Sequence, residues 1–292
     1  MSWRTVVVAK PSKLDLRLGC LVIRDSETVQ RVHLSEISVL IIENTASSVT
    51  TALLRELIRY KIKVIFCDEK RSPVSELTAY YGCHDSSLKI KKQLEWGMEI
   101  KQLVWTEIVR EKIKKQAQLL LNNELDSAAY MLFSYIDEME FNDETNREGH
   151  AAKVYFNSLF GKGFSRSDED PLNAALNYGY SLLLSCFNRE VVCNGYITQL
   201  GLFHDNMFND YNLSCDLMEP FRPLVDSIVK AYMPKKFETE EKREILNLFK
   251  TEVIIDGKKQ ILTNAIKIFC KSVFDALENR DVYLIKFYSY DL

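Results

Sequence analysis

Short hydrophobic runs alternate with polar turn sequences over the first eighty residues of the chain. β-Branched runs bounded by sequences such as Lys10-Pro11-Ser12 are typical of strands. The predicted strands span residues 5–9, 20–24, 28–34, 39–43, 64–67 and 77–81. Residues 48–60 differ, because Leu53, Leu54, Leu57 and Ile58 fall on one face of a helix. This pattern predicts a small β-sandwich interrupted by one helix.

From residue 86 onward the hydrophobic positions recur with the 3.6-residue period of helices. The predicted helices span residues 87–121, 124–139, 145–159, 171–194, 213–232, 239–250 and 264–279. Residues 253–262 contain Asp256-Gly257, which favours a type I′ hairpin. We therefore expect an α+β protein with a β-sandwich domain at residues 1–85 and a larger all-α domain at residues 86–292.

Composition excludes some classes of protein and leaves the partner open. The 292 residues contain no apolar run of the roughly 18 residues that would span a bilayer, so we expect no membrane association. The first ten residues lack the features of a signal peptide, which predicts a cytoplasmic protein. The net charge of −3 argues, taken alone, against nucleic acid. Acidic side chains can instead bind metal ions, so net charge does not decide the partner.

Three segments of the helical half contain candidate chemical residues. Glu148 lies in Asn146-Arg147-Glu148-Gly149-His150 at the start of a predicted helix, and His204 lies in a glycine-containing loop. Each has a structural alternative: a first-turn carboxylate stabilises the helix dipole, and a lone histidine is more often structural.

The third segment contains Asp216 and Glu219, which are three residues apart and would share a helix face. Pro220 and Pro223 follow, and prolines inside a helix are costly. Residues that are unfavourable for the local secondary structure, such as these prolines, are expected where function fixes the backbone. The alternative is an acidic helix start with proline at an early position.

Together, two carboxylates and a neutral imidazole would balance one divalent ion. Such oxygen and nitrogen ligands with open positions suit Mn²⁺ or Mg²⁺. This combination would be a site for phosphoryl transfer, although spacing alone leaves open whether Glu148, His204 and Glu219 meet.

Several ordered blocks of the chain resemble one known family. These blocks are WRTVVV at 3–8, VIFCDEKR at 64–71, YGCHDSS at 81–87, NREGHAA at 146–152, PLNAALNYGY at 171–180 and DLMEPFRPLVD at 216–226. They are similar to the CRISPR-associated endonuclease and integrase of the spacer-acquisition module, the "Cas-one" family, in its type II branch.

The resemblance implies a β-domain that forms a homodimer and a helical catalytic domain with a divalent-metal site. It places the Mg²⁺ or Mn²⁺ ligands, which are also the catalytic residues, on Glu148, His204 and Glu219, with Asp216 as an auxiliary residue. Glu219 stands where several other branches have aspartate, which puts the geometry of the site in question rather than its activity.

The resemblance also implies a reaction and partners. The family joins short duplex DNA to the leader-repeat junction of a CRISPR array, by attack of a DNA 3′-hydroxyl on a phosphodiester. It acts as a heterohexamer with a small second CRISPR-associated adaptation protein. The type II effector nuclease and a ring-shaped DNA-end-binding protein are further implied partners.

Arg147, Tyr178 and Arg222 are candidate DNA contacts near this site, as phosphate donors or a stacking ring. A helix-packing role is the alternative for each. Three other functions also stay open: a metal-dependent nuclease of DNA repair, a non-catalytic scaffold for DNA ends, and a helical protein with no nucleic-acid partner.

Overall fold

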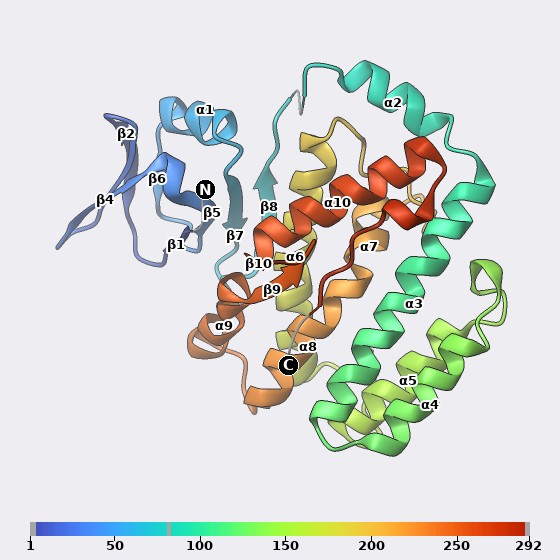
Figure 1. The fold of residues 1–292 in the computed structure, drawn as a ribbon. Coiled ribbons are helices and arrows are strands. Elements are labelled where there is room, and N and C mark those ends of the chain that lie inside the picture. The colour runs from blue at the N-terminus through green and yellow to red at the C-terminus, as the bar shows by residue number, and fades with distance from the viewer. Residues whose placement is uncertain (1–3, 81–82, 290–292) are drawn as a thin grey trace. The chain divides into compact units, whose positions relative to one another are not determined.

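The computed structural model describes residues 4–80 and 83–289. Its contacts divide the chain into two compact units, one ending at His84 and one beginning at Asp85. Figure 1 shows strands concentrated in the first unit and helices in the second. The predicted α+β class is confirmed.

The first unit contains two four-stranded sheets. One has the order β1 (Arg4–Val8), β5 (Ile37–Ile42), β7 (Lys63–Cys67) and β8 (Pro73–Leu77). The other has the order β4 (Val29–His33), β3 (Cys20–Arg24), β2 (Lys13–Arg17) and β6 (Ser48–Val49). β1, β5 and β7 are parallel, and β8 runs antiparallel to β7. The parallel pair β5 and β7 requires a crossover, which α1 (Thr51–Arg59) supplies.

Aliphatic side chains from both sheets and from α1 form one core. Leu14 and Leu21 from the second sheet, Leu40 from β5, and Leu53 and Leu57 from α1 belong to the same buried cluster. The Thr50 side chain accepts a hydrogen bond from the Leu53 backbone N–H and so begins α1. The predicted helical face is confirmed for Leu53 and Leu57.

The strand predictions were wrong at three places. β2 and β6 were missed, because charged residues alternate with the two leucines of β2 and β6 has only two residues. Residues 78–80 are not a strand. The strand instead ends at Leu77, because β8 pairs with β7 through a turn in which Asp68 accepts from the Ser72 N–H. Tyr81, where the predicted strand ended, lies outside the described residues.

The second unit is built on helices. Its longer helices are α2 (Ser86–Leu94), α3 (Met98–Asn122), α4 (Asp126–Asp137), α5 (Arg147–Phe160), α6 (Pro171–Cys193), α8 (Arg222–Tyr232) and α10 (Leu262–Asn279). α3 packs along α4 and α5, as Figure 1 shows. No helix in the described ranges is long and apolar enough to cross a membrane.

A hairpin, β9 (Glu252–Ile255) and β10 (Lys258–Ile261), interrupts the helices of this unit. Asp256 and Gly257 both have positive φ, so the predicted type I′ turn is confirmed.

The predicted helix at residues 87–121 is wrong as a single element. α2 ends at Leu94, and α3 begins after Gly97, whose backbone is extended. Residues 239–250 are likewise divided, into α9 (Thr239–Ile245) and a 3-10 turn, Leu246–Lys250.

The predicted helix at residues 213–232 is also broken, at the two prolines. α7 (Asn212–Met218) is followed by a 3-10 turn, Glu219–Phe221, and then by α8. Pro220 and Pro223 each lie in the first turn of a new helical segment. At that position the missing N–H of proline costs little. The break therefore avoids the cost of a proline inside a helix and places Glu219 at the junction between α7 and α8.

Candidate active site

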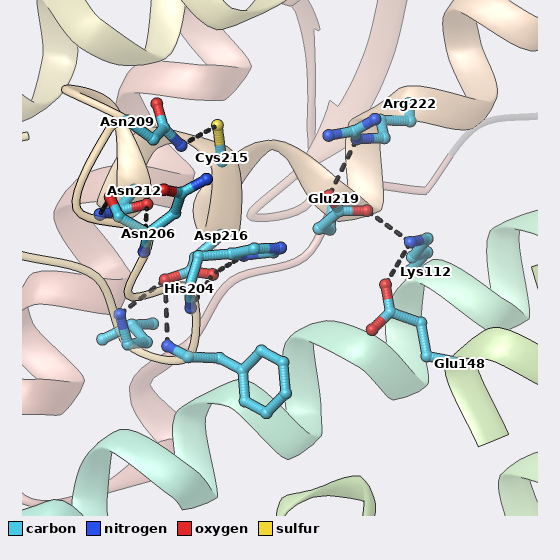
Figure 2. Close-up of polar contacts among 12 residues, drawn as sticks. Lys112, Glu148, His204, Asn206, Asn209, Asn212, Cys215, Asp216, Glu219 and Arg222 are labelled. Carbon is cyan, nitrogen blue, oxygen red and sulfur yellow. Dashed lines mark hydrogen bonds and ion pairs between the residues drawn. The ribbon is translucent and has the colours of Figure 1, made fainter. Parts of the chain in front are cut away.

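The centre of the candidate site is a lysine between two glutamates. Lys112 is in α3, and its Nζ lies 2.5 Å from Oε1 of Glu148 and 2.5 Å from Oε2 of Glu219. Figure 2 shows the ammonium between the two carboxylates, with the His204–Asp216 pair beside Glu219. The structure therefore brings two of the three predicted ligands to one cation of the chain.

Glu148 is held by the way α5 begins. Asp143 accepts hydrogen bonds from the backbone N–H groups of Arg147 (2.7 Å) and Glu148 (3.0 Å). Asn146 has a left-handed backbone, and its side chain accepts from the N–H of Gly149. These acceptors satisfy N–H groups that have no partner within the helix. They fix the first turn and so direct Glu148 toward α3.

Glu219 is 3% exposed and has a cation on each carboxylate oxygen. Arg222 Nε lies 2.9 Å from Oε1, while Lys112 lies beside Oε2. Burial alone would raise the pKa of Glu219, but the attraction of Arg222 and Lys112 lowers that pKa below its ordinary value. Burial would lower the pKa of Lys112, but Glu219 and Glu148 raise it. These groups therefore stay charged at neutral pH.

The loop that contains Gly201 and His204, called the His204 loop, folds over the Asp216 carboxylate. The fully buried Asp216 carboxylate accepts from the backbone N–H groups of Leu202 (2.6 Å), Phe203 (3.1 Å) and His204 (3.2 Å). A Cβ at Gly201 would come within 2.2 Å of the His204 carbonyl oxygen and 2.8 Å of Asp216 Oδ2. Only glycine allows this close approach.

Asp216 also contacts the imidazole of His204, with Oδ1 2.5 Å from Nδ1. This contact, acting against burial, raises the pKa of His204, and Glu219 and Glu148 add to the rise. Trp105 in α3 meets the ring edge-on at 5.7 Å. With Nδ1 directed at Asp216, Nε2 is the nitrogen left to contact an ion, as in carboxylate–histidine–metal arrangements.

These residues fit a divalent ion by their chemistry. Two carboxylates and an imidazole form the donor set, and a cation of the chain already lies between the carboxylates. Oε2 of Glu219 is buried and accepts no hydrogen bond from the residues described. The three predicted ligands are nevertheless not closed around one point. Within residues 4–80 and 83–289, no group of three or more His, Cys, Asp or Glu side chains is arranged to hold a metal ion.

The three candidate DNA contacts have different surroundings in the structure. Arg222 lies in the site beside Glu219. Arg147 instead turns to α4, with its guanidinium 2.9 Å from Glu138 and over the ring of Tyr135. Tyr178 is only 4% exposed and packs against Phe237. The helix-packing alternative describes Tyr178.

A buried carboxylate supports the site from behind. Asp226 accepts hydrogen bonds from the hydroxyls of Tyr155 in α5 (2.8 Å) and Tyr180 in α6 (2.5 Å). The Arg222 guanidinium lies 4.8 Å from the centre of the Tyr180 ring. Asp226 thereby links the helices that carry Glu148 and Arg222.

Sequence reasoning missed Lys112 and the tyrosine partners of Asp226. One signal pointed to Lys112: it stands four residues after Ile108 and four before Gln116, on the buried face of α3. A lysine on such a face requires a charged partner. The sequence does not say which partner, because Glu148 and Glu219 are distant along the chain.

Comparison with known proteins decides the family. The family model described as "CRISPR associated protein Cas1" matches residues 6–264. The chain belongs to the Cas1 family. It is 35% identical over 241 residues to a CRISPR-associated endonuclease Cas1 of Neisseria meningitidis. The matched region covers 82% of this chain and 79% of the relative. The predicted family resemblance is confirmed.

Solved structures share the Cas1 fold. A casposase bound to integration product has a TM-score of 0.76 at 18% identity, covering 97% of this chain and 93% of that one. A Cas6-RT-Cas1–Cas2 complex has a TM-score of 0.71 at 18% identity, covering 97% of this chain and 36% of that one. At these identities the likeness shows the fold alone.

Proposed function

We propose that this Cas1 protein joins short duplex DNA to a CRISPR array by transesterification. The observation that carries the proposal is the contact of Glu148 and Glu219 with one cation, Lys112, together with a His204 imidazole that Asp216 orients. Membership of the Cas1 family and the 35% identical endonuclease from Neisseria meningitidis support it. The fold shared with a casposase bound to integration product agrees with it.

In the proposed reaction, a DNA 3′-hydroxyl oxygen attacks the phosphorus of a repeat phosphodiester. A new phosphorus–oxygen bond forms, the bond to the repeat strand's own 3′-oxygen breaks, and that oxygen leaves with a proton. Hydrolysis is the same displacement with water as the nucleophile, so DNA cleavage is an expected side activity.

Glu148, Glu219 and Nε2 of His204 would hold the divalent ion, Mg²⁺ or Mn²⁺. When bound, such an ion supplies Lewis-acid activation of the hydroxyl and neutralises charge on the phosphate oxygens. Asp216 would accept a hydrogen bond from Nδ1–H of His204 and so leave the Nε2 lone pair for the ion. Arg222 balances the negative charge of Glu219.

The proposed partners are DNA, a second copy of the chain, and a Cas2 protein. A Cas1–Cas2 complex among the structures of the same fold supports the Cas2 partner. We further propose a heterohexamer with dimerisation through the β-unit, a cytoplasmic location, and a place in the type II branch. The type II effector nuclease and a ring-shaped DNA-end-binding protein would then act with it.

An integration assay tests this function. The protein, its Cas2 partner, a short duplex with free 3′-hydroxyls, and a supercoiled plasmid carrying leader and repeat are incubated with Mn²⁺ or Mg²⁺. We expect metal-dependent joined product that His204→Ala abolishes. The matched control is His150→Ala, which removes an exposed histidine from α5 and should leave joining intact.

The other outcomes identify the alternatives. Cleavage that depends on His204 without joining would indicate a repair nuclease. DNA binding with neither cleavage nor joining would indicate a scaffold for DNA ends. Either result would overturn the proposed transesterification.

A further inference from the structure

Lys112 contacts two of the proposed metal ligands, but the proposed chemistry gives it no role. Its side chain comes from α3, and the whole residue is 9% exposed. A buried ammonium is costly unless its charge is balanced. Here the balance comes from Glu148 and Glu219, whose oxygens each lie 2.5 Å from Nζ.

The bonding of this ammonium is uneven. Nζ donates a hydrogen bond to Glu148 Oε1, but its angles to Glu219 Oε2 are not those of a hydrogen bond. The three N–H bonds of an ammonium keep tetrahedral angles to one another, so donation to two oxygens at once requires both oxygens to lie along them. A divalent ion carries twice the charge of an ammonium and attracts an oxygen without an N–H bond aimed at it. The position between the glutamates is thus occupied by a cation that satisfies only one of them fully.

The formal charges of the site point the same way. Glu148, Asp216 and Glu219 carry three negative charges, and Lys112 and Arg222 carry two positive ones, which leaves −1 with a neutral histidine. Without Lys112 the balance is −2, equal and opposite to the charge of one divalent ion. Lys112 and the ion therefore compete for the same two carboxylates.

We propose that Lys112 is a resident cation that fills the ion position in the metal-free protein and that a divalent ion must displace. This inference rests on the proposed metal site and adds what sets its affinity. The lysine keeps two neighbouring carboxylates, one of them deeply buried, from facing each other without a counter-charge. The same contact weakens metal binding, because coupling between two ligands of one site is reciprocal.

The chain offers a matched control on the same helix. Lys115 is also buried, at 4% exposed, but it pairs with Glu111 and lies over the ring of Tyr288. A change at Lys115 removes a buried lysine charge from α3 without touching either glutamate. General effects of removing charge or of loosening α3 would appear in both variants.

The test is isothermal titration of Mn²⁺ into wild type, Lys112→Met, Lys112→Gln and Lys115→Gln. We expect the two Lys112 variants to bind Mn²⁺ about tenfold more tightly than wild type, within the usual range of coupling between sites. Lys115→Gln should bind as wild type does. In EDTA, Lys112→Met should melt at a lower temperature than wild type, and saturating Mn²⁺ should raise its Tm more.

Lys112→Gln guards against a misfolded Lys112→Met, because its amide still donates a hydrogen bond to a glutamate. Mn²⁺ affinity equal to or weaker than wild type in a folded Lys112 variant would overturn the competition. Mn²⁺ binding to a Lys112 variant but not to wild type would support it strongly. Absence of Mn²⁺ binding from every variant would instead overturn the metal site itself, and with it the proposed function.

Discussion

The interiors of the two units differ in the charged side chains that they bury. In the first unit the core is a continuous aliphatic cluster from two sheets and α1. Glu43 and Lys63 are the buried charged side chains among its described residues, and each pairs with one opposite charge. The second unit buries Asp216, Glu219 and Asp226 together in its interior.

This difference indicates that the interior of the first unit serves stability, whereas the buried charges of the second unit serve chemistry. Aliphatic burial stabilises a fold with no chemical consequence, whereas buried charges cost free energy unless they are paired. A cluster of buried charges is therefore expected where function requires it. In the helical unit, Glu219 shares Lys112 with Glu148, Asp216 contacts His204, and Asp226 accepts hydrogen bonds from two tyrosines. Substitutions in the two interiors should consequently have different kinds of effect.

The largest expected effect on stability is in the sandwich core. Leu40→Ala removes a fully buried side chain from β5. We expect the free energy of unfolding to fall by about 3 kcal/mol, because the lost burial and the cavity both contribute. Mn²⁺ affinity should not change. Urea denaturation and calorimetry measure both quantities, and weaker Mn²⁺ binding by the folded variant would break the separation between the two interiors.

The next largest expected effect is on Mn²⁺ affinity, through the orientation of His204. Asp216→Asn keeps the shape of the side chain but removes the charge that orients His204 Nδ1. We expect Mn²⁺ affinity to fall about 10-fold to 100-fold, the usual effect of removing the partner of a metal-binding histidine. Asp205→Asn, on the same loop, is the control and should change affinity by no more than about twofold. Equal losses in the two variants would contradict the role given to Asp216.

A pH-dependent effect is expected at Asp226. Burial raises the pKa of Asp226 to about 6, and the two tyrosine hydroxyls oppose the rise without cancelling it. A folded-state pKa above the unfolded one means that the folded protein takes up the proton first, so lowering the pH from 7.5 to 5 stabilises it. The gain from this group should be about 1.4 kcal/mol.

Asp226→Asn has no carboxyl group to titrate and should lose this gain. The difference in unfolding free energy, wild type minus variant, should therefore rise as the pH falls from 7.5 to 5. Urea denaturation of both proteins at the two pH values measures it. A difference that stays constant would show that Asp226 has the same pKa in the folded and unfolded protein.

The smallest expected effect lies at the start of α1. Thr50→Ala removes the side chain that accepts from the Leu53 N–H. We expect a loss of about 1 kcal/mol in the free energy of unfolding. Thr50→Ser retains the hydroxyl and should recover most of it. An equal loss in both variants would assign the effect to the methyl group rather than to the cap.

The sequence predicted those elements whose signals are local. α6 was predicted because its apolar residues recur with the helical period, and in the structure Asp170 and Pro171 mark its start. β2 was missed because its position depends on pairing with β3 rather than on its own charged sequence. The break after Leu94 was missed because apolar positions continue across Gly97.

Prediction of the site had a similar limit. The sequence marked Glu148, His204 and Glu219 as candidates, but the contact of Glu148 and Glu219 with one lysine depends on how α3 packs against α5 and the Glu219–Phe221 turn. Lys112 was missed because its partners are far away in the chain. The burial of Tyr178, for which DNA contact and helix packing were both open, follows from packing of α6 against the segment that contains Phe237.

The central claim is that His204, with Glu148 and Glu219, binds a divalent ion at the position now held by Lys112. Electron–nuclear double resonance of bound Mn²⁺ tests it most directly, because nitrogen coupling reports an imidazole ligand. We expect nitrogen coupling in the wild type and in His150→Gln, and its loss in His204→Gln. Mn²⁺ bound to the wild type without nitrogen coupling, or with coupling that persists in His204→Gln, would contradict the account.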